Sequence, residues 1–325
     1  MKLAILDDYQ RLALRLADWE RLRRRGCEIS VFDRAFASAE EAAERLAPFE
    51  ILVLMRERTP FPRALIDRLP KLGFMALTGL RSASLDLAAC SARRVPVANT
   101  RPGRTGAVTA ELAFGLILAA ARDFARAERN VRAGRWHEGL RGGTILEGKR
   151  LGILGLGKLG GRVAGYARAF GMEVVAWSQN LTADRAAEAG ARLLEKDELL
   201  RSSDFVTIHL VLSERTRALL GARELALMKP GAVLVNTSRG PIVEEKALLD
   251  ALASGRLAHA ALDVYDREPL PPGHPLAKLE NVTLLPHLGY VSEEVLASFW
   301  TDCIENVEAW LDGKPIRVLN PESLQ

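Results

Sequence analysis

The chain has 325 residues, which is long enough for two globular domains. Its mean hydropathy of +0.02 suits a globular protein with a hydrophobic core. Its net charge of +4 comes from acids and bases mixed along the chain, and the one dense basic run, 21–25, is expected to be a solvated helix face rather than a nucleic-acid site. The three cysteines are scattered, without a C-x-x-C pair or a Cys/His cluster, so neither a disulfide framework nor a zinc site is indicated and we expect no metal.

The first part of the chain alternates between strand-like and helix-like segments. Short apolar runs predict strands at 2–6, 28–32, 51–55, 74–78 and 95–98, with helical patterns between them, for example at 39–46 and 61–69. This alternation predicts a parallel sheet with both faces covered. Asp7 and Asp8 end the first short run, which indicates a strand rather than a signal peptide. No apolar run reaches membrane-spanning length, so we expect a cytoplasmic protein with no membrane partner.

A second α/β unit is predicted further along the chain. A long apolar helix at 109–121 is expected to be buried or to contact another subunit, and 122–149 has the pattern of a helix followed by an extended arm. Predicted strands follow at 151–154, 174–177, 205–210, 233–236, 260–264 and 282–285. The last predicted helix, 292–311, has one apolar stripe, formed by Val295, Phe299, Cys303, Val307 and Trp310. The expected fold class is therefore α/β, with two Rossmann-like or flavodoxin-like parallel-sheet domains and a cleft between them.

A glycine turn joins the strand at 151–154 to the next predicted helix. Gly155, Gly157 and Gly160 fit G-x-G-x-x-G, and Lys158 and Leu159 fill the positions between the last two glycines. The first glycine permits a tight turn, the second lets the backbone approach a pyrophosphate, and the third lets the helix pack on the strand. The helix N-terminus offers N–H groups to phosphate, so the sequence predicts a dinucleotide site.

The choice between NAD and NADP stays open. The second strand of this unit runs into Ser178, Gln179 and Asn180, where an acid normally binds the adenine ribose hydroxyls. Such an acid would repel the extra phosphate of NADP, and its absence removes that discrimination. Arg185 follows in the next segment but does not lie immediately beside the strand end.

Three polar segments follow strands in the second unit, at 236–240, 263–269 and 285–289. Ligands of open α/β sheets bind outside the carboxyl ends of the strands, so these segments are expected to converge on one crevice near the nicotinamide. We also place His209, Thr216 and Thr237 in the expected cofactor site, whereas His137, His259 and His274 are expected to be structural or solvent-facing.

The three segments lie in the stretches LVNTSRGPIVEEKALLDAL, AALDVYDREPLP and NVTLLPHLGY. Together with the glycine turn, these stretches resemble the D-isomer-specific 2-hydroxyacid dehydrogenases, a family that includes phosphoglycerate dehydrogenase and glyoxylate/hydroxypyruvate reductase. The resemblance implies that Arg239, Glu268 and His287 are the catalytic residues and that Asp263 helps to hold the nicotinamide carboxamide. It further implies a discontinuous substrate domain, 1–98 plus 291–325, around a dinucleotide-binding domain at 99–290, and a homodimer built through the cofactor domain.

The residue types suit the interconversion of a 2-keto acid and a D-2-hydroxy acid. His287 can give a proton to the keto oxygen, since histidine titrates near neutral pH. Glu268 would orient the imidazole and favour its charged form. Arg239 offers a planar fork that can bind a carboxylate and polarise the keto oxygen.

The loop at 79–86 departs from the family pattern, because Arg81 replaces a glycine and Ala83-Ser84 replace an Asp-Asn pair. The resemblance places the substrate carboxylate on backbone N–H groups here, a role that Leu80 and Arg81 can keep, and Gly79 is a further candidate for substrate binding. Arg81 either lies on the surface or adds a charge for a phosphorylated or dicarboxylic substrate. Arg56 is a further candidate for substrate binding.

Two alternatives stay open from the sequence. One is a formate or phosphite dehydrogenase, which uses the same Arg and His with different substrate walls. The other is a non-catalytic dinucleotide sensor that acts like a corepressor, which the presence of Arg239, Glu268 and His287 disfavours.

Overall fold

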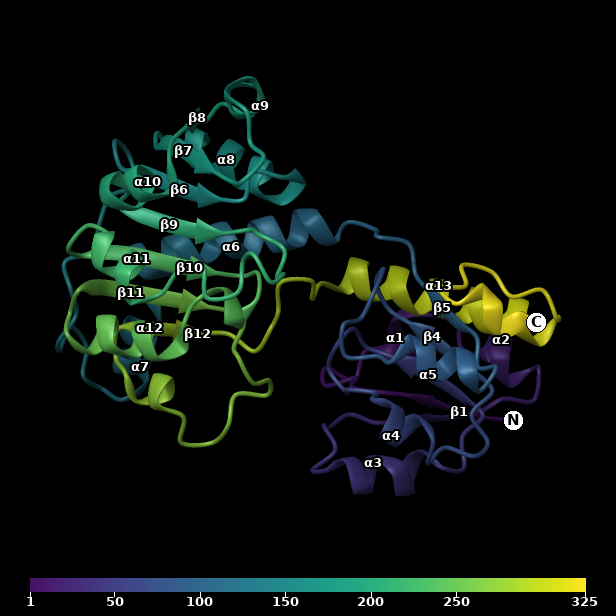
Figure 1. Ribbon diagram of the computed structural model, residues 1–325. Helices are drawn as coiled ribbons and strands as arrows, with labels where there is room; N and C mark the ends of the chain where they lie inside the picture. The colour runs from purple at the N-terminus through teal and green to yellow at the C-terminus, as the bar shows by residue number, and fades with distance from the viewer. The chain divides into compact units, whose positions relative to one another are not determined.

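The computed structural model describes residues 1–325 and divides into two compact units, each built on a parallel sheet (Figure 1). The first unit contains Met1–Arg104 and Val291–Gln325, and the second contains Thr105–Tyr290. The prediction of two α/β domains with parallel sheets is confirmed. The chain leaves the first unit after Arg104, later than the expected 98, and the cleft expected between the domains stays a prediction.

The first unit has a five-stranded sheet in the order β2-β1-β3-β4-β5. Its strands are β1 (Lys2–Ile5), β2 (Glu28–Val31), β3 (Ile51–Leu54), β4 (Phe74–Leu77) and β5 (Val97–Asn99). Its helices are α1 (Ala13–Leu16), α2 (Glu20–Arg23), α3 (Ala39–Leu46), α4 (Arg63–Ile66), α5 (Leu87–Ala92), α13 (Glu293–Leu311) and the 3-10 helix η3 (Pro321–Leu324). Every residue of β3 and β4 is buried, as expected for central strands covered on both faces.

The helix predicted at 61–69 is shorter than expected. Phe61 forms a bridge with Leu85, and Pro62 has an extended backbone, so α4 begins only at Arg63. The apolar periodicity that suggested a longer helix comes from side chains that are buried outside the helix as well as within it.

The second unit has a seven-stranded sheet in the order β12-β11-β10-β9-β6-β7-β8. Its strands are β6 (Arg150–Leu154), β7 (Glu173–Trp177), β8 (Arg192–Leu193), β9 (Phe205–Ile208), β10 (Ala232–Asn236), β11 (Leu257–Leu262) and β12 (Val282–Leu284). Its helices are α6 (Thr105–Arg122), α7 (Phe124–Arg132), α8 (Lys158–Ala169), α9 (Ala183–Glu188), α10 (Lys196–Ser202), α11 (Ala222–Leu227), α12 (Glu245–Ala253), and the 3-10 helices η1 (Gly240–Ile242) and η2 (Pro275–Lys278).

Two strands of the second unit end earlier in the structure than the sequence predicted. β9 ends at Ile208 and β11 ends at Leu262, so His209 and Asp263 lie just beyond the carboxyl ends of their strands. The edge strand β8 was not predicted, because a strand of two residues leaves no alternation to detect.

Helix α6 packs into the core of the second unit. Its buried residues, which include Ala113, Phe114 and Ile117, join a cluster with side chains of the sheet and of α8. By length and composition alone α6 could cross a membrane, so the expectation that no segment reaches this length is wrong. The core helix of a globular domain meets the same criterion.

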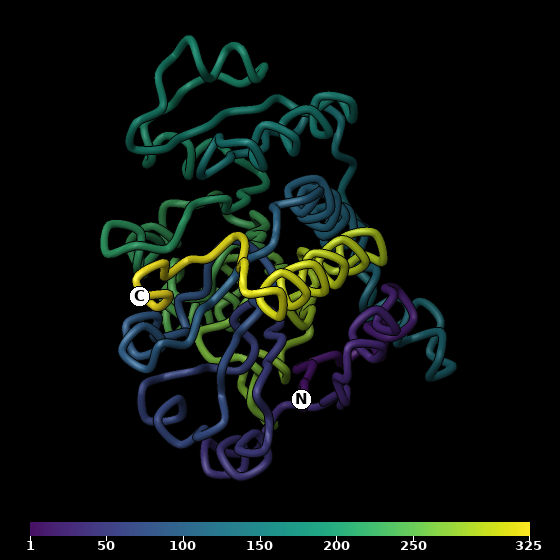
Figure 2. The backbone as a smooth tube through the Cα atoms, turned by 90° about the vertical axis from the view of Figure 1, so that its right-hand side faces the viewer, coloured from purple at the N-terminus to yellow at the C-terminus, as the bar shows by residue number.

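Helix α13 returns the chain to the first unit (Figure 2). Ser292 caps it by accepting a hydrogen bond from the Val295 N–H at 3.3 Å. The predicted apolar stripe is buried from Val295 to Val307, and the Trp310 ring stacks on Phe74 with 5.2 Å between centroids. The basic run at 21–25 faces the acids of this helix, since Arg21 pairs with Glu308 and Arg25 pairs with Asp312.

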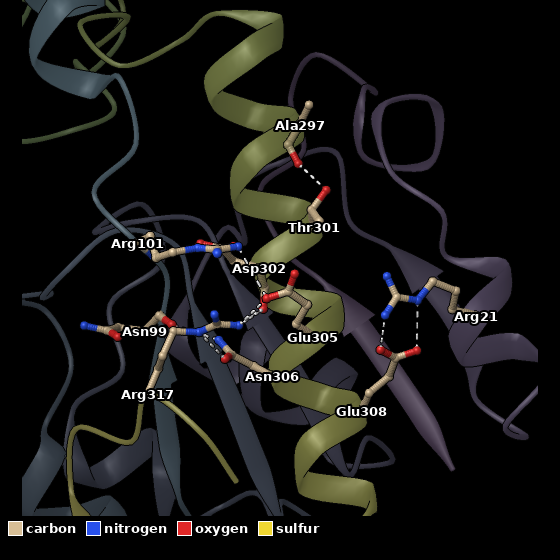
Figure 3. A network of polar contacts seen from close by, with 10 residues as sticks. All are labelled: Arg21, Asn99, Arg101, Ala297, Thr301, Asp302, Glu305, Asn306, Glu308 and Arg317. Carbon is tan, nitrogen blue, oxygen red and sulfur yellow. Dashed lines mark hydrogen bonds and ion pairs between the residues drawn. The ribbon is translucent and has the colours of Figure 1, made fainter.

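A polar network joins α13 to the segment after β5 (Figure 3). The fully buried Asp302 accepts the backbone N–H of Arg101 at 2.8 Å and also binds its guanidinium. Asn306 donates to the Asn99 carbonyl at 2.8 Å and accepts from the Arg317 guanidinium at 2.8 Å. These contacts anchor the chain on α13 shortly before it leaves the first unit.

Replacing Asp302 should destabilise this unit. In Asp302→Ala the Arg101 N–H loses its charged acceptor, which we expect to lower the free energy of unfolding by about 2–3 kcal/mol. Urea unfolding followed by tryptophan fluorescence measures the change. The control is Glu128→Ala, which breaks an exposed helix pair with Arg132 and should cost less than about 0.5 kcal/mol. Equal effects of the two variants would contradict the anchoring role.

Candidate active site

The glycine turn has two glycines fixed by packing and one that faces open space. A Cβ on Gly155 would lie 2.7 Å from the His209 carbonyl carbon, and a Cβ on Gly160 would lie 2.2 Å from the Gly155 oxygen. A Cβ on Gly157 would meet nothing within 4 Å, and φ there is an ordinary −90°. Protein packing therefore does not explain why residue 157 is a glycine. A ligand that comes close to the backbone at the N-terminus of α8 would explain it, and the pyrophosphate of a dinucleotide is such a ligand.

The other residues expected at the cofactor surround this turn. Lys158 is exposed at the start of α8, and Leu159 packs against the core. Past the end of β7, Ser178 is partly exposed and both Gln179 and Asn180 are exposed. No carboxylate occupies this strand end in the structure.

Two of the expected cofactor residues have a definite local role. Burial lowers the pKa of His209 to about 3, so its imidazole is neutral near pH 7, with Nε2 3.1 Å from the Thr207 hydroxyl. The Thr216 hydroxyl accepts the Ser213 N–H at 2.8 Å and donates to the Val211 carbonyl at 2.7 Å, which holds its own turn together.

Thr237, just after β10, differs from these two. Its side chain is 7% exposed, and its hydroxyl has no hydrogen-bond partner. A buried hydroxyl without a partner is costly unless a ligand completes it, so this residue also fits a cofactor site.

The turn after β10 shapes the backbone around Arg239. The Asn236 amide donates to the Arg239 carbonyl at 2.9 Å and accepts the Ser238 N–H at 3.0 Å. A Cβ on Gly240 would lie 2.1 Å from the Tyr265 carbonyl carbon, so only glycine can follow Arg239 here. Sequence analysis did not single out Asn236 or Tyr265, since their contacts join segments that are adjacent only in the folded sheet.

Asp263 fixes the turn that contains His287. Its two carboxylate oxygens accept the N–H groups of Leu288 and Gly289, each at 2.7 Å. Burial raises the pKa of Asp263 above its ordinary value, while these hydrogen bonds and the charge of His287 act in the opposite direction. Inside this turn His287 has a φ of 55°, a left-handed conformation that a non-glycine residue keeps only when its surroundings hold it.

Glu268 and His287 form a short hydrogen bond. The distance from His287 Nδ1 to Glu268 Oε2 is 2.6 Å, and Nδ1 must be the donor because a carboxylate only accepts. The other oxygen, Oε1, accepts the Tyr265 N–H at 2.9 Å. Burial alone would raise the pKa of Glu268, but the hydrogen bond and charge of His287, with a smaller effect of Arg239, bring it below its ordinary value. Glu268 is therefore a carboxylate near neutral pH.

The expected substrate residues lie in the first unit. Arg56 follows β3 with a φ of 55°, and its guanidinium fills the space beside Gly79, where a Cβ would come within 2.0 Å of Nη1. The Gly79 N–H is already bonded to the Thr100 hydroxyl at 2.7 Å, so only Leu80 and Arg81 can offer N–H groups to a ligand. The side chains of Leu80 and Arg81 are both exposed.

Comparison with known proteins gives matches across both units. A family model described as D-isomer specific 2-hydroxyacid dehydrogenase, NAD binding domain, matches residues 114–289. The glyoxylate reductase of Korarchaeum cryptofilum (strain OPF8) is 37% identical over 295 residues, which cover 89% of this chain and 88% of that protein. The D-3-phosphoglycerate dehydrogenase of Archaeoglobus fulgidus is 35% identical over 296 residues, which cover 91% of this chain and 55% of that protein.

A solved structure agrees with these sequence matches. The crystal structure of phosphoglycerate oxidoreductase from Vibrio cholerae o395 is similar with a TM-score of 0.91 and 37% identity, covering 96% of this chain and 99% of that one. The matched region of the family model contains the glycine turn and all three polar turns of the second unit. The chain belongs to the D-isomer-specific 2-hydroxyacid dehydrogenase family.

Proposed function

We propose that Arg239, Glu268 and His287 interconvert a 2-keto acid and its D-2-hydroxy acid, with NAD or NADP as cofactor. The observation that supports this most is the 2.6 Å bond between His287 and Glu268, which pairs a proton donor with an ionised carboxylate. The three side chains follow β10, β11 and β12, which are neighbours in one parallel sheet, so their carboxyl ends meet at one edge.

Each residue has a separate task in reduction. When bound, the nicotinamide supplies the hydride that reaches the keto carbon. His287 gives its Nε2 proton to the keto oxygen as the carbon–oxygen double bond opens, and the neutral imidazole then regains a proton from solvent. Glu268 holds Nδ1 and stabilises the charged imidazolium before the transfer. Arg239 binds the substrate carboxylate and polarises the keto group. In oxidation His287 takes the hydroxyl proton instead.

The two alternatives receive less support. The matched relatives with printed activities are reductases and dehydrogenases, and a sensor that only binds dinucleotide has no need of the Glu268–His287 pair. No feature of the substrate residues favours formate or phosphite over a keto acid.

Removal of the imidazole should abolish most of the activity. His287→Ala loses the proton donor while the glycine turn is untouched, so kcat for keto-acid reduction should fall by about 10²–10⁴-fold. Steady-state kinetics with a panel of 2-keto acids measures the fall. Titration of NADH and NADPH should give nearly unchanged Kd values, and turnover near that of the wild type would rule out His287 as the proton donor.

The charge of Glu268 should be needed for fast reduction. The lowered pKa of Glu268 keeps its side chain an anion at neutral assay pH, so it should add no acid limb to the pH profile there. In Glu268→Gln the anion that holds Nδ1 of His287 is lost, so kcat/KM for keto-acid reduction should fall at neutral pH. Steady-state kinetics tests this, and a variant as active as the wild type would contradict the assigned role.

We propose that the enzyme accepts both NADPH and NADH, since Ser178 stands where an acid would reject the extra phosphate. Ser178→Asp should shift the ratio of kcat/KM values toward NADH. The matched control is Ser178→Asn, which is similar in size and uncharged. If the wild type already rejects NADPH as strongly as the Asp variant, another group controls the choice.

We also propose that a second copy of the chain covers α7 and the arm after it. Phe124, Val131, Trp136 and Ile145 are apolar side chains that are each at least 55% exposed within this stretch. Sedimentation analysis should find a homodimer, and Val131→Asp with Trp136→Asp should yield monomers. Leu14→Asp, an exposed apolar position of α1 in the first unit, should stay dimeric. A monomeric wild type would contradict the proposal.

A further inference from the structure

The chain enters and leaves the second unit at neighbouring places. Thr105, the first residue of this unit, begins α6, and Tyr290 is its last residue. Thr109, one turn into α6, donates its hydroxyl to the Gly289 carbonyl at 2.6 Å. Gly289 lies two residues after His287. A single hydroxyl therefore connects the first helix of the unit to the turn that contains the candidate proton donor.

The geometry of α6 alone does not account for this hydroxyl. Thr109 Oγ1 also lies 2.9 Å from the Thr105 carbonyl, the acceptor that a threonine within a helix ordinarily uses. A hydroxyl has one hydrogen and can donate it fully to only one of two carbonyl oxygens. The shorter distance favours Gly289, so the hydrogen bond to the turn is preferred over the one within the helix.

Gly289 is buried and is held on both of its sides. Its N–H donates to Asp263 Oδ2 at 2.7 Å, while its carbonyl accepts from Thr109. A Cβ at this position would lie 3.2 Å from Asp263 Oδ2 and 3.3 Å from Thr109 Cγ2. The absence of a side chain thus lets both residues approach the backbone closely. Asp263 holds the turn through N–H groups, and Thr109 holds it through a carbonyl.

The restraint from Thr109 matters because the turn contains a conformation that needs support. His287 has a φ of 55°, which a non-glycine residue keeps only when its surroundings hold it. The imidazole binds Glu268 and lies nearly perpendicular to the Tyr290 ring, with 5.9 Å between ring centroids. Both contacts depend on the backbone of this turn. A hydroxyl that fixes the Gly289 carbonyl therefore also helps to fix the direction of the imidazole.

We infer that Thr109 is a positioning residue for proton transfer, which acts on His287 through the Gly289 carbonyl. This inference rests on the proposed function and adds to it a residue of α6. Thr109 acts on the backbone of the turn, so its contribution is to hold the imidazole in the orientation that proton transfer requires. The first helix of the second unit thereby takes part in the geometry of a site that otherwise comes from the strand ends of β10, β11 and β12.

Two substitutions of Thr109 separate its hydroxyl from its methyl group. Thr109→Val keeps the shape and removes the donor, so kcat for keto-acid reduction should fall by about 5- to 50-fold, because the buried Gly289 carbonyl loses its hydrogen bond. Thr109→Ser keeps the donor and should stay within about 3-fold of the wild type. The Kd of NADH should be nearly unchanged in both variants, since the glycine turn is not altered. Steady-state kinetics and a cofactor titration measure these values.

Thr301→Val is the matched control. The Thr301 hydroxyl donates at 2.8 Å to the Ala297 carbonyl, one turn earlier in α13 (Figure 3). The substitution removes a hydrogen bond of the same kind within a helix, so kcat should stay within about 2-fold of the wild type. In the His287→Ala background, Thr109→Val should lower the residual kcat by less than about 2-fold, because no imidazole is left to position. An equal fall in both backgrounds would indicate a general structural role and overturn the inference.

Nitrogen-15 NMR of histidine-labelled protein gives a readout that does not depend on activity. The Nδ1 signal of His287 should differ from that of the wild type in Thr109→Val and should not differ in Thr301→Val. The inference is wrong if kcat is unchanged in Thr109→Val, if Thr109→Ser loses as much activity as Thr109→Val, or if the Nδ1 signal does not shift. If the wild type reduces no keto acid, the proposed function fails, and the NMR comparison still decides whether Thr109 positions His287.

Discussion

The geometry of the candidate active site depends on Asp263. Its two carboxylate oxygens accept hydrogen bonds from the N–H groups of Leu288 and Gly289, each at 2.7 Å, and these two bonds fix the shape of the turn between β12 and α13. His287 is held in a left-handed conformation within that turn, which directs Nδ1 to Glu268 and leaves Nε2 as the atom assigned to proton transfer. A buried acid that binds two backbone donors thus determines where a neighbouring imidazole can point, and the proposed chemistry follows from that orientation.

Sheet topology supplies the rest of the site. β10, β11 and β12 are adjacent and parallel, so side chains that are far apart in the sequence arise from one edge. Gly240 permits the turn after β10 to press against Tyr265, and Tyr265 in turn binds Glu268 through its N–H. A larger residue at 240 would displace the turn that contains Arg239. The turns are therefore mutually dependent, and a change in one is expected to disturb the orientation of the others.

Much of this arrangement could be predicted from the sequence, because the informative residues lie at the ends of strongly apolar strands. The periodic stripe of α13 and the glycine turn are local patterns of the same kind. Contacts between segments that are far apart in the chain produce no such local pattern in the sequence, so they could not be predicted. The packing of Gly240 on Tyr265, the position of Arg56 beside Gly79 and the bridge that shortens α4 all depend on which loops the folded sheets bring together. Cofactor preference could not be predicted, because Ser178 has neither the negative charge that would repel the extra phosphate of NADP nor a positive charge that would attract it.

The central claim is that His287 donates Nδ1–H to Glu268 and exchanges its other proton with the substrate. Nitrogen-15 NMR of histidine-labelled protein tests it most directly. The account predicts that in the neutral imidazole Nδ1 carries the hydrogen and Nε2 does not, and that Glu268→Gln changes the Nδ1 signal. A neutral His287 with its hydrogen on Nε2, or an Nδ1 signal that is the same in Glu268→Gln, would contradict the account.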